Sequence, residues 1–204
     1  MIENNQYAAF LADFASGRLS EGERLAARLH FALSDNGADN ARMLDVIGGV
    51  ALERLQAAAI GDADHPGDRE DEIATAERSG SDWIAHYASA DLLALKWRRN
   101  LVGVRTRSTH LPTATLLRLE PGEHAPRHSH GASDVTVVLQ GAFADDWGEY
   151  HRGDLAFADA GDRHAPATIG NETCVCLVAT SKGRPDVDLK AWLAGQWRRG
   201  GASR

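Results

Sequence analysis

Residues 122–141 of the chain, GEHAPRHSHGASDVTVVLQG, combine two closely spaced histidines with an apolar run. His128 and His130 are two positions apart, so both imidazole rings point to the same face if this segment is an extended strand. Asp134 follows at the head of the apolar run, where an inward-facing carboxylate is costly unless it is paired with a cation. This combination of side chains predicts a metal site inside a β-structure.

A third histidine completes the candidate site. His164 follows the strand-like segment 154–158 and a turn that contains Gly161. An imidazole-rich site with one carboxylate suits zinc, but iron, nickel, copper or manganese accept the same donors, so the ligand types leave the metal open. We expect one ion to be bound by His128, His130, Asp134 and His164. The alternative for an isolated His-x-His pair is a polar surface turn that binds nothing.

The second half of the chain has the pattern of an all-β structure. From Gly103 onward, short segments rich in Val, Thr and Leu are separated by turn residues, which favours an antiparallel barrel or jelly roll. Strands are expected at 113–119, 134–139, 154–158 and 173–180. The last of these contains both cysteines of the chain, Cys174 and Cys176, whose side chains we expect on opposite faces of the strand, so a disulfide framework is not supported.

The first sixty residues have the pattern of helices. Two runs of apolar residues at helical spacing are separated by Gly17, and Ser20 with Glu23 fits a capping box at the start of the second run. A third helix is expected from Asp39 to Ile60. The apolar faces of the first two helices are formed by Tyr7, Phe10, Leu11 and Phe14, and by Leu25, Ala26, Leu29 and Leu33.

These patterns predict an α+β protein with a helical domain at 1–60, a linker at 61–81 and a β-domain at 82–200. The linker GDADHPGDREDEIATAERSGS lacks large aromatic side chains, contains Gly and Pro, and is rich in acidic residues. The apolar residues that follow it are expected to cover one edge of the β-domain as a collar: Trp83, Ile84, Tyr87, Leu92, Leu93, Leu95 and Trp97.

Charge and hydropathy exclude several classes of function. The formal net charge of −7 and the pI near 5.7 argue against direct binding to nucleic acid, because neutralising phosphates needs clustered Lys and Arg. No segment approaches the roughly 20 consecutive apolar residues that span a bilayer, and the N-terminus lacks a basic and apolar leader. We therefore expect a cytoplasmic protein without a membrane anchor.

The spacing of the histidine motif resembles that of the cupin superfamily, whose first motif is Gly, five residues, His-x-His, three or four residues, Glu, six residues, Gly. Gly122, His128, His130, Asp134 and Gly141 fit every interval, with Asp in place of Glu. The second cupin motif appears as Gly153, Asp159, Gly161, His164 and Thr168, with Asp159 in place of a Pro. Because Asp134 reaches about one methylene less far than Glu, a water molecule could take its place as a ligand.

A helical segment joined to a cupin that contains Cys174-Val-Cys176 resembles the ChrR-type anti-sigma factors of bacteria. The resemblance implies that the helical domain binds a sigma factor of the extracytoplasmic-function (ECF) type and that the cupin senses an oxidative or small-molecule signal. It also implies a zinc site in the helices, made by a His and a His-x-x-x-Cys-x-x-Cys. Here His30 matches, but Asn5, Ser34 and Gly37 occupy the other positions. We expect this second site to be absent and the helices to be held by apolar packing alone.

Three functions are compatible with these features. The first is a regulator without enzymatic turnover, which is the expectation favoured by the resemblance. The second is a metal-dependent cupin enzyme, an oxygenase or isomerase, which would need an open coordination position on the metal. The third is a helical interaction module that makes the protein a homodimer, with the barrel as a scaffold.

Overall fold

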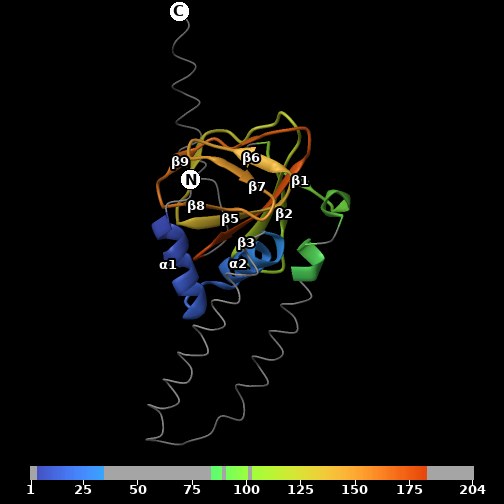
Figure 1. The fold of residues 1–204 in the computed structure, drawn as a ribbon. Helices are drawn as coiled ribbons and strands as arrows, with labels where there is room; N and C mark the ends of the chain where they lie inside the picture. Colours follow the sequence, from blue (N-terminus) through green and yellow to red (C-terminus); the bar gives the residue numbers. More distant parts are fainter. Residues whose placement is uncertain (1–3, 35–83, 89–90, 101–102, 183–204) are drawn as a thin grey trace, which may run out of the picture.

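The computed structural model describes residues 4–34, 84–88, 91–100 and 103–182. Within them, two N-terminal helices precede an antiparallel β-domain, which confirms the α+β class (Figure 1). The third helix expected at Asp39–Ile60 and the linker at 61–81 lie outside the described residues. The division into domains at 1–60 and 82–200 therefore stays a prediction.

The structure contains both of the helices expected before residue 35. Helix α1 spans Asn4–Ala15 and helix α2 spans Glu21–Leu33. The capping box is confirmed, since the Ser20 hydroxyl accepts a hydrogen bond from the Glu23 amide at 3.2 Å and the Glu23 carboxylate accepts one from the Ser20 amide at 2.8 Å. Gly17 has a φ of +71°, a left-handed conformation that lets the chain turn between the helices.

The β-domain consists of one large sheet and two small ones. The large sheet has the order β1-β2-β3-β11-β5-β8, and the small sheets are β10-β6-β7 and β4-β9. In chain order the elements are a helical turn at 84–88, η1 (Leu92–Ala94), β1 (Arg98–Arg99), β2 (Arg105–Ser108), β3 (Ala114–Leu119), β4 (His128–Ser129), β5 (Asp134–Gln140), β6 (Ala142–Ala144), β7 (Glu149–His151), β8 (Leu155–Ala158), β9 (Arg163–His164), β10 (Ala167–Thr168) and β11 (Cys174–Thr180).

Strand β11 lies between β3 and β5 and is buried along its whole length. Val175, Leu177 and Ala179 belong to a hydrophobic cluster that also contains residues of α1 and α2. Cys174 and Cys176 belong to a second cluster, on the opposite face of the strand. The large sheet therefore separates the interior of the barrel from the two helices, which lie below β3 and β5 in the view of Figure 1.

Helix α2 approaches the β-domain closely at both of its ends. Near its start, the Gly22 amide donates to the Thr113 hydroxyl at 2.9 Å, and a Cβ at Gly22 would lie 2.6 Å from the Thr113 carbonyl oxygen. Near its end, a Cβ at Gly153 would lie 2.7 Å from the Ser34 amide nitrogen. The expectation that apolar packing alone holds the helices was wrong, because glycine contacts and hydrogen bonds also fasten α2 to the barrel.

The collar that was expected before the barrel is present in part. Tyr87 and Leu92 are buried in the same cluster as the helices, while Leu93 is 36% exposed and Trp83 lies outside the described residues. Three further collar residues pack against the cluster: Ile84, Leu95 and Trp97. Over the described residues, we find no helix with the length and apolar character needed to cross a membrane.

Candidate metal centre

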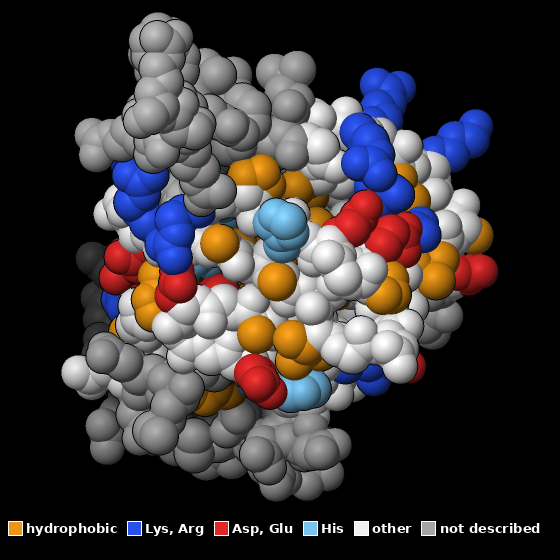
Figure 2. Space-filling view, turned by 90° about the horizontal axis from the view of Figure 1, so that it is seen from above, with side chains coloured by type: hydrophobic (Ala, Val, Ile, Leu, Met, Phe, Trp, Pro, Cys, Tyr) orange, Lys and Arg blue, Asp and Glu red, His pale blue; other side chains and the backbone are white. Residues whose placement is uncertain are grey.

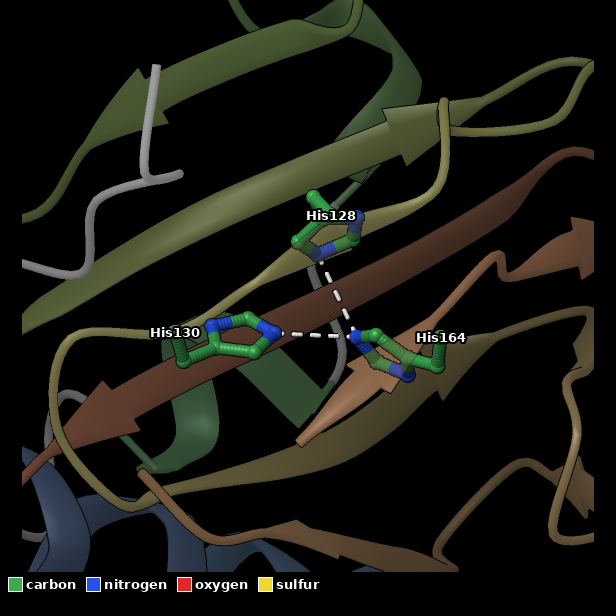
Figure 3. Close-up of side chains that lie close together, drawn as sticks. All are labelled: His128, His130 and His164. Carbon is green, nitrogen blue, oxygen red and sulfur yellow. Dashed lines mark hydrogen bonds between the residues drawn. The ribbon is translucent and has the colours of Figure 1, made fainter. Parts of the chain in front are cut away.

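Three histidines converge at one end of the barrel interior. His128 in β4 and His164 in β9 are directly paired across two antiparallel strands, and His130 follows β4 by one residue (Figure 3). The Nε2 atom of His164 lies 2.9 Å from Nε2 of His130 and 3.2 Å from Nε2 of His128. The structure thus brings together the three histidines that the sequence singles out.

The three rings have the geometry of metal ligands. Their ligand atoms all lie within 4.8 Å of one another. Tetrahedral zinc with Zn–N bonds of about 2.0–2.1 Å separates its nitrogen ligands by about 3.3 Å, close to the observed spacing. Where the rings carry their protons on Nδ1, the Nε2 lone pairs face one another, which is unfavourable unless a cation lies between them. The three-histidine cluster can hold a metal ion.

Each imidazole is also anchored at its other ring nitrogen. Nδ1 of His128 lies 2.8 Å from the Pro126 carbonyl oxygen, which can only accept, so Nδ1 carries the proton and Nε2 has a free lone pair. Nδ1 of His130 lies 2.5 Å from a carboxylate oxygen of Asp134, and Nδ1 of His164 lies 2.9 Å from one of Asp145. Such partners orient ligating histidines and increase their basicity.

Asp134 contacts the back of His130 and lies outside the three-histidine group. Its side chain is 3% exposed, and its Oδ2 lies 2.5 Å from Nδ1 of His130, in a contact that lacks the geometry of a directed hydrogen bond. A buried carboxylate oxygen with no hydrogen-bond donor is costly unless positive charge is close. Asp134 therefore supports a cation at this site, and its predicted role as a direct ligand stays a prediction.

Burial keeps His128 neutral. Desolvation is the largest influence on its pKa, which falls from 6.5 to about 4; the neighbouring His164 and His130 lower it further, while the hydrogen bond to Pro126 raises it. The ring is therefore uncharged at neutral pH. A neutral imidazole is the form that binds metal ions.

The turn between β6 and β7, which no sequence motif singled out, also contacts the site. Asp145 accepts the hydrogen bond from His164, and the indole of Trp147 stacks on the His164 ring at a centroid distance of 5.1 Å. Burial raises the pKa of Asp145, but the bonds from His164 and from the amides of Trp147 and Gly148 outweigh it, so the net shift is downward. A short polar segment at a hairpin has no sequence signal that distinguishes it from an ordinary surface turn.

A cavity of about 80 Å³ lies beside the histidines, inside the barrel. Its wall is mainly apolar and includes Leu117, Phe143, Cys174 and Cys176. The prediction that the cysteines lie on opposite faces was wrong, because positions two apart on a strand share a face, and their sulfur atoms are 3.5 Å apart. The hydrogen bond with Cys174, together with burial, raises the pKa of the Cys176 thiol well above its usual value.

The other histidines of the described residues are not part of the three-histidine cluster. His124 and His151 are exposed, and His151 is the last residue of β7. His30 is buried in α2, where Nε2 lies 2.8 Å from the Tyr7 hydroxyl and Nδ1 lies 2.7 Å from the Gly153 carbonyl oxygen. Both of its ring nitrogens are occupied by hydrogen bonds. Of the positions aligned with the second zinc site, Asn5 is exposed, Ser34 is half-buried and Gly37 lies outside the described residues.

Comparisons with known proteins match both halves of the chain. Residues 86–183 match the family model of the ChrR cupin-like domain. The chain is 31% identical over 193 residues to the anti-sigma-E factor ChrR of Cereibacter sphaeroides, covering 88% of this chain and 90% of that protein. It is also similar to the crystal structure of Rhodobacter sphaeroides SigE in complex with the anti-sigma ChrR, with a TM-score of 0.63, 31% identity, and coverage of 84% of this chain and 95% of that chain.

Proposed function

The chain belongs to the family of ChrR-type anti-sigma factors, and on this premise we propose that it is a cytoplasmic regulator that binds and inhibits an ECF sigma factor. The observation that carries the proposal is the extent of the similarity to ChrR. It covers 88% of the chain, whereas the cupin-like domain alone accounts for residues 86–183, so the helical half is included. The relative is a regulator, and this kinship gives no support to the alternative of a cupin oxygenase or isomerase.

The partner is proposed to be a protein and not nucleic acid. On the face shown in Figure 2, acidic and basic side chains lie next to one another over the described residues. Arg105 lies 2.7 Å from Glu123, and Arg118 lies 2.8 Å from Glu120, so these basic groups are already paired. Basic groups that are paired with carboxylates are poorly available to bind phosphates. Control of transcription would then act through the sigma factor.

The metal is proposed to be zinc, bound by His128, His130 and His164. A zinc ion would supply positive charge at the end of the barrel and order the β4–β9 pair, and a signal molecule in the adjoining cavity would act on this centre.

Asp134 is proposed to belong to the site, either as the fourth zinc ligand or as the residue that supports His130 from behind. The two roles predict different losses of zinc affinity when Asp134 is removed. If Asp134 only supports His130, Asp134→Ala should weaken zinc binding by about 10–100-fold, measured by competition with a chelator. Loss as complete as in His128→Ala would assign Asp134 as a ligand.

Coexpression with the cognate ECF sigma factor tests the proposed function. The two proteins should copurify, and the complex should suppress transcription that depends on this sigma factor. The variant His164→Ala should still bind the sigma factor but respond less to a chelator or an oxidant, whereas the exposed control His124→Ala should behave as the wild type. Failure to copurify under reducing, zinc-replete conditions would contradict the proposal.

A further inference from the structure

The turn between β6 and β7 places a buried carboxylate against a metal-site histidine. The side chain of Asp145 is 1% exposed, and its Oδ2 accepts a hydrogen bond from Nδ1 of His164 at 2.9 Å. Its Oδ1 accepts hydrogen bonds from the amides of Trp147 at 2.9 Å and Gly148 at 3.3 Å. The backbone of the turn therefore fixes the carboxylate in place independently of His164.

We propose that Asp145 is the positioning residue of the metal centre, which holds His164 in the Nδ1–H tautomer so that its Nε2 lone pair faces the ion. The inference rests on the proposed metal site and deepens it. A carboxylate can only accept hydrogen bonds, so it stabilises the tautomer with the proton on Nδ1. In the opposite tautomer, Nε2 would carry a proton and could not bind a metal. Asp145 lies outside both histidine motifs, 19 positions before His164.

Two further contacts tie the same turn to the metal centre. One guanidinium nitrogen of Arg127 donates to both carboxylate oxygens of Asp146, at 2.8 and 2.7 Å. Arg127 also donates to the Arg163 carbonyl oxygen at 3.1 Å. Arg127 precedes His128 in the chain, and Arg163 precedes His164. The face of the His164 ring is covered by Trp147, with an interplanar angle of 28°. His164 is thus held at its edge by Asp145 and on its face by Trp147.

Each of the three histidines is anchored by a different group. A substitution of Asp145 can therefore test the anchoring of His164 separately from that of His128 and His130. His128 is anchored by the backbone carbonyl of Pro126, which no substitution removes, and His130 by Asp134, four residues along the same segment. Asp145 instead lies in the turn that joins β6 and β7, two strands of the sheet β10-β6-β7. Its removal should release His164 alone.

The decisive variant is Asp145→Asn, with Glu149→Gln, an exposed carboxylate at the start of β7, as the matched control. The Asn amide is nearly isosteric and can donate a hydrogen bond to Nδ1, so it should favour the wrong tautomer. Nitrogen-15 NMR of the histidine rings of the full chain without zinc, at pH 8, reports the tautomer directly. Competition with a chromophoric chelator then gives the zinc affinity. We expect His164 to change from Nδ1–H to Nε2–H in Asp145→Asn only, with zinc affinity lowered by about 10–100-fold.

Each result has a defined meaning. An unchanged His164 tautomer, or zinc affinity within about twofold of Glu149→Gln, overturns the inference while the zinc site of the wild type stands. If the tautomer changes as expected but the wild type binds no zinc, the metal site fails and Asp145 keeps its role as the anchor of His164. If Asp145→Asn does not fold, Asp145→Ser replaces it, because a serine hydroxyl can still accept from the Trp147 amide but is too short to reach His164.

Discussion

At the scale of single residues, His30 connects three parts of the molecule. Its ring joins Tyr7 of α1 to the Gly153 carbonyl oxygen before β8, while its own backbone belongs to α2. Burial lowers the pKa of His30 below its ordinary value of 6.5, although the bond to Gly153 and the charge of Asp154 act in the opposite direction. The neutral ring can donate from Nδ1 and accept at Nε2, which matches its two partners.

The pH dependence of stability should reveal this residue. Because the pKa of His30 is lower in the folded than in the unfolded state, the unfolded state binds more protons just below pH 6.5, and the free energy of unfolding must fall as the pH decreases from there. In urea denaturation, His30→Gln should lose this part of the pH dependence, whereas exposed His151→Gln should retain it. Parallel curves for wild type and His30→Gln between pH 5 and 7 would refute this assignment.

At the scale of elements, sequence patterns place the long strands and helices well, and the short strands poorly. The expected strand at 134–139 becomes β5, Asp134–Gln140, because a short apolar run rich in Val is typical of a strand in a buried sheet. Strands β4 and β9, of two residues each, have no periodicity, although they position two of the histidines. The docking of α2 and the anchoring by Asp145 depend on contacts between distant segments, for which local patterns carry no signal.

The close approach of α2 to Gly153 can be tested with a matched pair of glycines. Gly153 and Gly161 both have a φ of +91°, but only a Cβ at Gly153 meets other atoms, those of Leu33 and Ser34. Gly161→Ala should cost about 1–2 kcal/mol from backbone strain. Gly153→Ala should lower the free energy of unfolding by at least about 1 kcal/mol more, because the added methyl group displaces the end of α2. If both variants lose the same free energy of unfolding in urea denaturation, the end of α2 can move away from residue 153 without destabilising the protein.

At the scale of the whole molecule, one sheet links the metal centre to the helices. On β5, Asp134 and Thr136 face the cavity, while Val135 and Val137 pack with the helices on the other side. The helices and the sheet share one hydrophobic cluster, so a change in the strands at the metal centre reaches α2 through a single layer. This arrangement gives a regulator a direct physical connection between its sensing and binding parts.

Hydrogen–deuterium exchange of the full chain should detect this connection. Removing zinc with a chelator is expected to speed amide exchange in β5, in β11 and in residues 21–33 of α2, because the strands that support the helix become less ordered. The same treatment of His164→Ala should have little further effect. Exchange in α2 that does not respond to zinc, despite a response at β4 and β9, would contradict coupling through the sheet.

We propose that three imidazoles at the end of the barrel hold one ion. X-ray absorption spectroscopy of the zinc-loaded full chain tests it most directly. We expect one zinc per chain, with three imidazole nitrogens at about 2.0–2.1 Å and one oxygen ligand. A chain that retains no zinc after loading, or a spectrum with sulfur at about 2.3 Å, would contradict it.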